Sequence, residues 1–300
     1  MEHDLHPQED YSHTLGSDEY EALYFCFTAP DISLFGWMRL LFSVERVLEM
    51  VVLRVGDRTW VHQQYFDCVA RVGGAARSVG RFLSLACTTP WQTWQLDYSA
   101  AEITPVEGGS PATIYAALTF HASNPPARYR FGRYQQSEQE GRLEGQLRIG
   151  ERRWAGPLIC YRDHSWGLRP VGTAVGWDAL VHPERFYLAA VQTQTGLFSM
   201  GRVLTGAGEY RPAGRPILAQ VDDVWRFEDA EAGLPPLTVR RPVAPVRVYL
   251  DPVGHETVRD VALPGDWLRD ELGPAIFTDA EGTESLGFWE RACPAVILTP

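Results

Sequence analysis

Short apolar runs, separated by Gly, Pro and Asp, extend along most of this chain. Residues 113–121 show the pattern most clearly, because apolar and polar positions alternate there. Successive side chains of a strand point to opposite faces, so this stretch predicts a half-buried strand. One face would carry Ile114, Ala116, Leu118 and Phe120, and the other Tyr115, Thr119 and His121. Many such runs at a spacing of roughly 8–12 residues indicate an all-β protein built from barrels or sandwiches.

Three pairs of runs flank turn-forming residues and predict hairpins. The turns are Gly56-Asp57, Gly150-Glu151 and Gln194-Thr195-Gly196. Residues 41–51 also fit one face of a helix, but the turn at Gly56-Asp57 favours strands there. The only short helix that the pattern predicts covers residues 267–272.

The composition limits the classes of partner. The hydrophobic fraction of 45% and the ten Trp suffice for a well-buried core. The net charge of −11, without a basic stripe, argues against a nucleic-acid partner and against attachment to an anionic membrane. All 27 basic residues are Arg. The absence of Lys excludes Schiff-base chemistry and a phosphate-binding P-loop.

The five Cys are odd in number and show no Cys-x-x-Cys spacing, which argues against a structural zinc site and a disulfide framework. We expect most of them to be buried, in a reducing compartment. The start Met-Glu-His-Asp lacks the apolar stretch of a signal peptide, and no run of about 18 apolar residues exists. We therefore expect a cytoplasmic protein that does not insert into a membrane.

The densest chemistry lies in residues 161–169, with the sequence Tyr-Arg-Asp-His-Ser-Trp-Gly-Leu-Arg. Asp and Gly disfavour strands, and a buried Asp-His pair is costly unless it is satisfied. We expect this segment at a strand end or a bulge. In a regular strand, Asp163 and His164 would point to opposite faces and could not enter one cavity together. Departures from local rules of this kind indicate a functional site.

The chain resembles the carotenoid-hydratase-like, lipocalin-type β proteins, a group that includes fungal Diels-Alderases. The similarity rests on the aromatic run at residues 24–27, on residues 94–98 with the strand after them, and on the Arg-Asp-His-Ser-Trp-Gly segment, which is similar to that of a bacterial branch. It covers residues 20–290. The resemblance implies two lipocalin-like β domains side by side, over residues 19–158 and 159–300, after a flexible N-terminal segment over residues 1–18. It also implies an apolar cavity for a terpenoid, polyene or polyketide.

Relative to the carotenoid hydratases, Arg162 replaces a His and Ser165 replaces an Asn, whereas Asp163, His164, Trp166 and Gly167 are shared. Hydration or cyclisation of an alkene begins with a proton delivered to carbon, which requires an acid in an apolar pocket. We predict Asp163 as this acid, with His164 and Arg169 orienting it. The predicted walls of the substrate cavity are Tyr161, Trp166, Trp177, His121, Trp94 and Phe27.

Two further functions stay open at this point. A pericyclase would fold a linear polyene and act mainly through proximity. A lipid or terpenoid carrier would perform no chemistry. The motif could also be purely structural: Asp163 would pair with Arg162, Arg169 or a distant Arg and brace the junction between the domains. We expect a hydrophobic small-molecule partner and no cofactor, and no spacing in the chain suggests a metal site. The sequence does not indicate an oligomeric state.

Overall fold

The computed structural model describes residues 6–67, 73–168, 174–193, 196–204, 210–212, 217–221, 224–229, 233–250, 256–257 and 268–294. It divides into two compact units, residues Met1–Arg169 and Pro170–Pro300. Apart from one short 3-10 helix, η1 (Pro7–Asp10), the regular elements of the described residues are strands. The expected all-β class with two units is confirmed. No helix among the described residues has the length and apolar character needed to cross a membrane.

The first unit contains one antiparallel sheet of twelve strands. The strands are β1 (Tyr20–Thr28), β2 (Phe35–Phe42), β3 (Arg46–Val55), β4 (Arg58–Asp67), β5 (Arg77–Val79), β6 (Leu83–Thr89), β7 (Thr93–Ile103), β8 (Ala112–Ala122), β9 (Ala127–Phe131), β10 (Tyr134–Ile149), β11 (Arg152–Trp154) and β12 (Leu158–Gly167). Their order is β4-β3-β2-β1-β12-β10-β8-β7-β6-β5, with β9 and β11 paired to β10.

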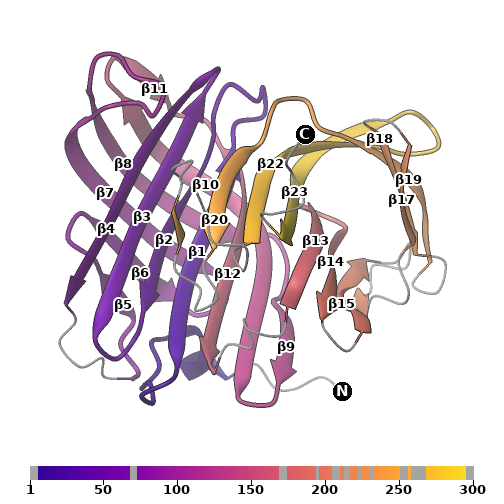
Figure 1. Cartoon of the computed structure of the whole chain (residues 1–300), viewed down its shortest axis with the longest axis horizontal. Coiled ribbons are helices and arrows are strands. Elements are labelled where there is room, and N and C mark those ends of the chain that lie inside the picture. Colours follow the sequence, from indigo (N-terminus) through magenta and orange to yellow (C-terminus); the bar gives the residue numbers. More distant parts are fainter. Residues whose placement is uncertain are drawn as a thin grey trace. The chain divides into compact units, whose positions relative to one another are not determined.

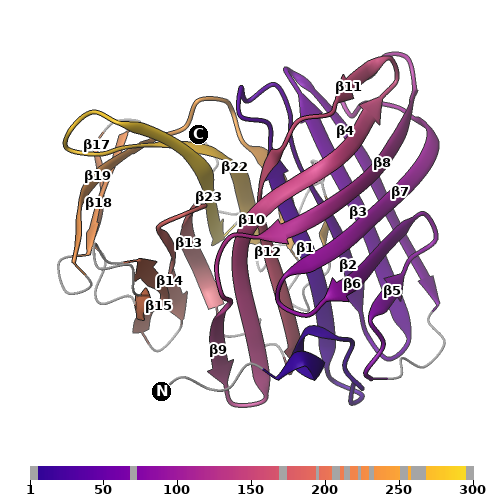
Figure 2. The same ribbon diagram turned by 180° about the vertical axis from the view of Figure 1, so that it is seen from behind.

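This first sheet curls around its own core. Strands β2, β3 and β4 are in front in Figure 1, and β10, β8 and β7 are in front when the molecule is seen from behind in Figure 2. An isolated bridge between Trp60 and Pro105 joins β4 to the segment that follows β7, which brings the two arms of the sheet together. The enclosed apolar core draws on alternate residues of the curled strands, among them Phe25, Leu96 and Phe120.

Residues 6–18, expected to be a flexible segment, instead pack against the first sheet. Asp10 of η1 is completely buried, and the backbone amide of Ser12 donates to the carbonyl of Ala75. Strand β12 also lies between β1 and β10 of this sheet, so the first unit extends beyond the predicted boundary at residue 158. A strand paired on both edges satisfies its backbone groups within the sheet, so β12 belongs to the first unit.

The second unit contains a sheet of eleven strands. They are β13 (Ala174–His182), β14 (Phe186–Thr193), β15 (Gly196–Leu204), β16 (Tyr210–Pro212), β17 (Ile217–Val221), β18 (Val224–Asp229), β19 (Leu234–Arg240), β20 (Val246–Leu250), β21 (Glu256–Thr257), β22 (Leu268–Thr278) and β23 (Glu284–Pro294). The path runs β16-β15-β14-β13-β23-β22-β19-β18-β17, with β20 paired to β22 and β21 paired to β20. A smaller apolar core, including Phe186, Phe277 and Trp289, packs on it.

Several predicted elements are confirmed. Strand β8 has the expected faces, with Ile114, Ala116, Leu118 and Phe120 buried. The predicted hairpins correspond to β3–β4, β10–β11 and β14–β15. The helix predicted at residues 267–272 is wrong, because residues 268–272 belong to β22, which pairs with β23 along eleven residues. Trp267 lies outside the described residues. Strand pairing over that length outweighs a weak local helical pattern.

Candidate functional site

The segment Arg162 to Gly167 forms the end of β12, so of the two expected positions the strand end is confirmed and the bulge is wrong. Its register with β1 and β10 is continuous from Leu158 to Gly167. Side chains therefore alternate between the two faces of the sheet. Arg162 and His164 lie opposite Phe25 and Leu23, on the face of the apolar core, and Asp163 lies on the other face. The predicted partnership of Asp163 with His164 is thus wrong, because a regular strand separates them.

On the core face, Arg162 forms a buried ion pair with Asp10. The Nη2 atom of Arg162 donates to Asp10 Oδ1 at 2.6 Å, and its Nε donates to Gln139 Oε1 at 2.9 Å. The guanidinium carbon lies 5.2 Å from the centre of the Trp94 ring, within range of a cation–π contact. The two charges compensate each other at a depth where either one alone would be strongly unfavourable.

The second oxygen of Asp10 organises the adjacent loop. It accepts the backbone N–H of Trp91 at 2.6 Å and the indole N–H of Trp94 at 3.2 Å. Trp91 has φ near +60°, a region that non-glycine residues rarely adopt, and its carbonyl accepts Gln139 Nε2. Burial of Asp10 favours its neutral form, but the charge of Arg162, the neighbouring His164 and the backbone N–H of Trp91 outweigh this and hold the pKa of Asp10 well below its usual value.

Also on the core face, Glu21 joins two imidazoles. His164 Nε2 lies 2.9 Å from Glu21 Oε1, and His13 Nδ1 lies 2.9 Å from the same oxygen. His164 Nδ1 lies 3.8 Å from Asp10 Oδ1, and the ring of Trp166 stacks on His13 at 4.0 Å. Burial of His164 disfavours its charged form, but Asp10 and Glu21 outweigh this and raise the pKa of the imidazole. The ligand atoms of His13, Glu21 and His164 lie within 4.8 Å of one another, so this group could hold a metal ion.

On the opposite face, four polar side chains form one row across four neighbouring strands. Arg39 of β2 lies opposite Tyr24 of β1, Tyr24 opposite Asp163 of β12, and Asp163 opposite Glu138 of β10. The amide nitrogen of Gln136 donates to Asp163 Oδ2 at 2.8 Å and also to Glu138 Oε1. Two carboxyl groups thus contact one amide nitrogen. Glu138 is completely buried, and Asp163 and Tyr24 keep part of their surface exposed.

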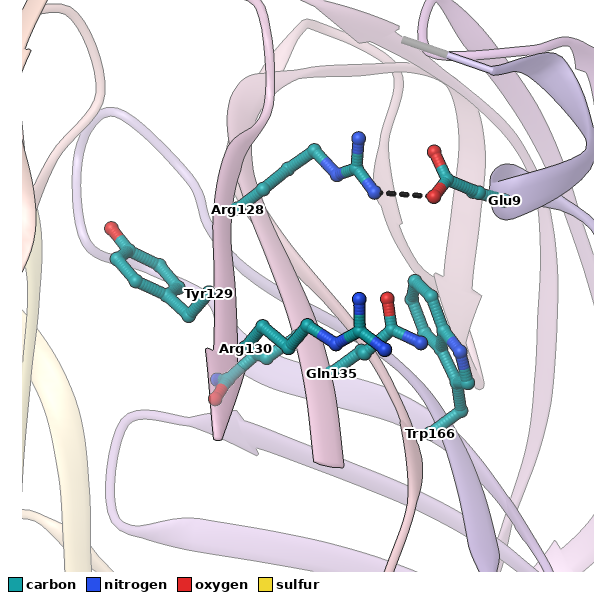
Figure 3. Close-up of a pocket in the computed structure, with 7 residues that line it drawn as sticks. Glu9, Arg128, Tyr129, Arg130, Gln135 and Trp166 are labelled. Atoms are coloured by element: carbon teal, nitrogen blue, oxygen red, sulfur yellow. Dashed lines mark hydrogen bonds and ion pairs between the residues drawn. The ribbon is translucent and has the colours of Figure 1, made fainter. Parts of the chain in front are cut away.

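A pocket of about 340 Å³ opens beside these clusters, at the β9 end of the sheet. Figure 3 shows Arg128, Arg130, Gln135 and Trp166 directed toward it, with Glu9 paired to Arg128. The ion pair measures 2.6 Å. Gln136 also lines this pocket, and its side chain lies on the Asp163 face of the sheet.

The other predicted site residues are dispersed. Phe27 and Trp94 are buried in the first core. His121 is about half exposed on the outer face of β8, 4.0 Å from Glu144, and does not face the core. Tyr161 lies on the Asp163 face, with its ring centre 6.3 Å from that of Tyr24. Trp177 belongs to the second unit, where its indole donates to Glu290, and Arg169 lies outside the described residues.

Sequence reasoning missed Asp10, His13, Glu21, Gln136 and Glu138. A signal existed for Glu21, because it interrupts the apolar start of β1 with a charge at a position that the strand period assigns to the core. Asp10 and His13 gave no such signal, since they precede the first strand.

Solved structures of other proteins share the fold of this chain. A protein of Nitrosomonas europaea, provisionally assigned as AttH, superposes with a TM-score of 0.63 at 12% identity, over 95% of each chain. Kievitone hydratase from Nectria haematococca gives 0.54 at 10% identity, over 96% of this chain and 92% of that one. CghA gives 0.57 at 12% identity, over 93% and 89%. The expected lipocalin-type resemblance therefore holds for the fold, and a shared fold does not decide function.

Two comparisons concern the sequence alone. The family model of a domain of unknown function, DUF7064, matches residues 6–230. None of the curated proteins matches the chain by sequence.

Proposed function

Because the chain belongs to the DUF7064 family, whose function is unknown, we propose an activity from its own residues: it is an enzyme that protonates an alkene of a hydrophobic terpenoid or polyene. The products would arise by hydration, dehydration, isomerisation or cyclisation. The likeness of the fold to kievitone hydratase supports this class of reaction. The proposal needs no redox cofactor, because a proton and water balance each of these reactions.

The observation that carries the proposal is the contact of Asp163 and Glu138 with one amide nitrogen of Gln136. Two carboxylates held this close repel each other, so the pair favours a state that keeps one proton. A carboxylic acid in a site shielded from water is the group that alkene protonation requires. Asp163 is the donor because it is the more exposed of the two.

The steps conserve atoms and charge. The π electrons of the alkene take the proton from the Asp163 carboxyl, which forms a new C–H bond and leaves a carbocation on the neighbouring carbon. Water then attacks the cation, and its proton passes to the carboxylate pair, which yields an alcohol. Loss of a proton from carbon instead yields an isomer. Tyr24 and Tyr161, on the same face, offer aromatic rings that stabilise the cation.

The test has two stages. Native mass spectrometry of the purified protein, before and after extraction with organic solvent, identifies a bound apolar molecule if one is retained. The protein is then incubated in D₂O with that molecule, or with geraniol, farnesol, lycopene and kievitone. Products are analysed by liquid chromatography and mass spectrometry, where deuterium at carbon reports proton transfer.

Asp163→Asn should lower turnover by about 10²–10⁴-fold, the usual contribution of a general acid. The matched control is Glu144→Gln, because Glu144 lies on β10 like Glu138 but is exposed. Turnover within a few-fold of wild type, without deuterium at carbon, would identify a pericyclase. Tight binding without any conversion would identify a carrier.

A further inference from the structure

We propose that His13, Glu21 and His164 form a binding site for a divalent transition-metal ion, for which Zn²⁺ is the best fit. This site lies on the core face of the sheet, away from Asp163, and the proposal is independent of the proposed activity. The three side chains come from the N-terminal segment, from β1 and from β12, and only the fold brings them together.

The geometry suits coordination. Nδ1 of His13 and Nε2 of His164 each lie 2.9 Å from Glu21 Oε1, and all three ligand atoms fall within 4.8 Å of one another. Zn²⁺ binds nitrogen and oxygen at about 2.0–2.2 Å, which places neighbouring ligand atoms of a tetrahedral site roughly 3.3 Å apart. Each of the two His–Glu21 distances therefore needs to lengthen by only a few tenths of an ångström to admit the ion.

The surroundings resemble the support that metal ligands usually have. A ligating His commonly directs its second ring nitrogen toward a carboxylate, which fixes the ring and its tautomer. Nδ1 of His164 has Asp10 Oδ1 at 3.8 Å. His13 is held by the parallel ring of Trp166, at 4.0 Å and an interplanar angle of 7°. The stack with Trp166 orients the His13 imidazole, and a carboxylate lies near the second nitrogen of His164.

The charges in this region favour a cation. The buried side chains of Asp10 and Glu21 carry two negative charges, and the buried guanidinium of Arg162 supplies one positive charge. Two buried carboxylates beside one guanidinium favour a cation at this place. Two imidazoles and one carboxylate suit Zn²⁺ and its neighbours, whereas Mg²⁺ and Ca²⁺ prefer all-oxygen sites.

The ion also has a route to the site. The side chain of His13 is 19% exposed, while those of Glu21 and His164 are completely buried. Trp166, which stacks on His13, lines the pocket beside β9. The side of the site toward His13 is therefore where water or another ligand completes the coordination of the metal, as in sites with three protein ligands.

The test measures metal binding by the whole protein. Chelator-treated protein is titrated with ZnCl₂ by isothermal titration calorimetry, and with CoCl₂ by visible absorption, which reports the coordination of Co²⁺. Wild type should bind one ion of each saturably, and should not respond to MgCl₂ or CaCl₂. His13→Ala should weaken Zn²⁺ binding by at least ~100-fold, since even the loss of a supporting residue costs 10–100-fold. This variant removes the most exposed ligand and so carries the least risk of misfolding.

The matched control is His121→Ala, because His121 is an exposed His with a carboxylate, Glu144, 4.0 Å away. It should bind Zn²⁺ like wild type, and His13→Cys should recover part of the affinity. Absence of saturable binding to wild type, or equal affinity in wild type and His13→Ala, would overturn the proposal. Asp163→Asn should bind metal normally, so a failure of the metal site is distinguishable from a failure of the proposed activity.

Discussion

Removal of the negative charge of Asp10 should destabilise the first unit severely. Asp10 and Arg162 have side-chain exposures of 0% and 1%, and Nη2 donates to Oδ1 at 2.6 Å. In Asp10→Asn the guanidinium stays buried, with Gln139 as its remaining hydrogen-bond partner among the described residues. Breaking a buried pair by removing one partner typically costs about 3–5 kcal/mol, because the other charge is left uncompensated. Asn keeps an oxygen that can accept from Trp91 and Trp94, so we expect the lower end, about 3 kcal/mol.

The same geometry predicts strong coupling. In Arg162→Met, Asp10 keeps the N–H groups of Trp91 and Trp94 as donors. In the double variant Asp10→Asn/Arg162→Met neither residue leaves the charge of the other unpaired, so its cost should fall clearly below the sum of the two single costs. The surface pair of Glu19 and Arg133, whose side chains are 20% and 57% exposed, provides the control, and Glu19→Gln should cost less than about 1 kcal/mol.

The free energy of unfolding would be measured by urea titration of chelator-treated protein, followed by Trp fluorescence. Since two units need not unfold in one transition, hydrogen exchange of peptides from β12 assigns the affected transition to the first unit. A cost for Asp10→Asn equal to that for Glu19→Gln would refute the reasoning, as would additive costs in the double variant.

Three further predictions concern other parts of the chain. Burial of His182, with the charge of Arg185, lowers the pKa of the imidazole from 6.5 to about 4. As the pH falls, the unfolded chain therefore takes up a proton before the folded one does. The free energy of unfolding of the second unit should decrease by about 3 kcal/mol between pH 7 and pH 4. Urea titrations should show this loss in wild type and not in His182→Asn. Gly167 has φ of +101°, and a Cβ there would lie 2.0 Å from the carbonyl oxygen of Arg133. Gly167→Ala should therefore lower the melting temperature clearly. Gly156 has open space around it, so Gly156→Ala should leave the melting temperature nearly unchanged. Burial raises the pKa of the Cys87 and Cys160 thiols, so iodoacetamide should label both only after unfolding, as judged by peptide mass mapping.

The strands were predictable from the sequence because local alternation determines which side chains a strand buries. In β8 every second residue from Ile114 to Phe120 is apolar, and these are the buried ones. The same alternation predicted that the side chains of Asp163 and His164 would point to opposite faces of a regular strand. The segment was expected at a strand end or a bulge. It lies at the end of β12, without a bulge, because Asp163 and Glu138 find partners on the second face of a regular strand.

The polar clusters could not be predicted, since they depend on contacts distant in sequence. Arg162 and Asp10 are 152 positions apart, and His164 and Glu21 are 143 apart. Local pattern treats residues 6–18 as a polar segment with nothing to bury. The segment packs against the sheet instead, because the buried guanidinium of Arg162 requires a carboxylate on the core face of β12. Asp10, which is distant in sequence, supplies it.

The two faces of β12 have different roles in the Arg162–Gly167 segment, and substitutions along this one strand can test the difference. On the core face, Arg162 contacts Asp10 and His164 contacts Glu21, so substitution of Arg162 or His164 should lower stability or metal affinity. Asp163 contacts Gln136 on the other face, so Asp163→Asn should lower turnover and leave the unfolding of the first unit nearly unchanged. The two kinds of effect should therefore alternate with the period of the strand. An Arg162→Met variant that slowed turnover at unchanged stability would contradict this division, because the core face would then take part in the chemistry.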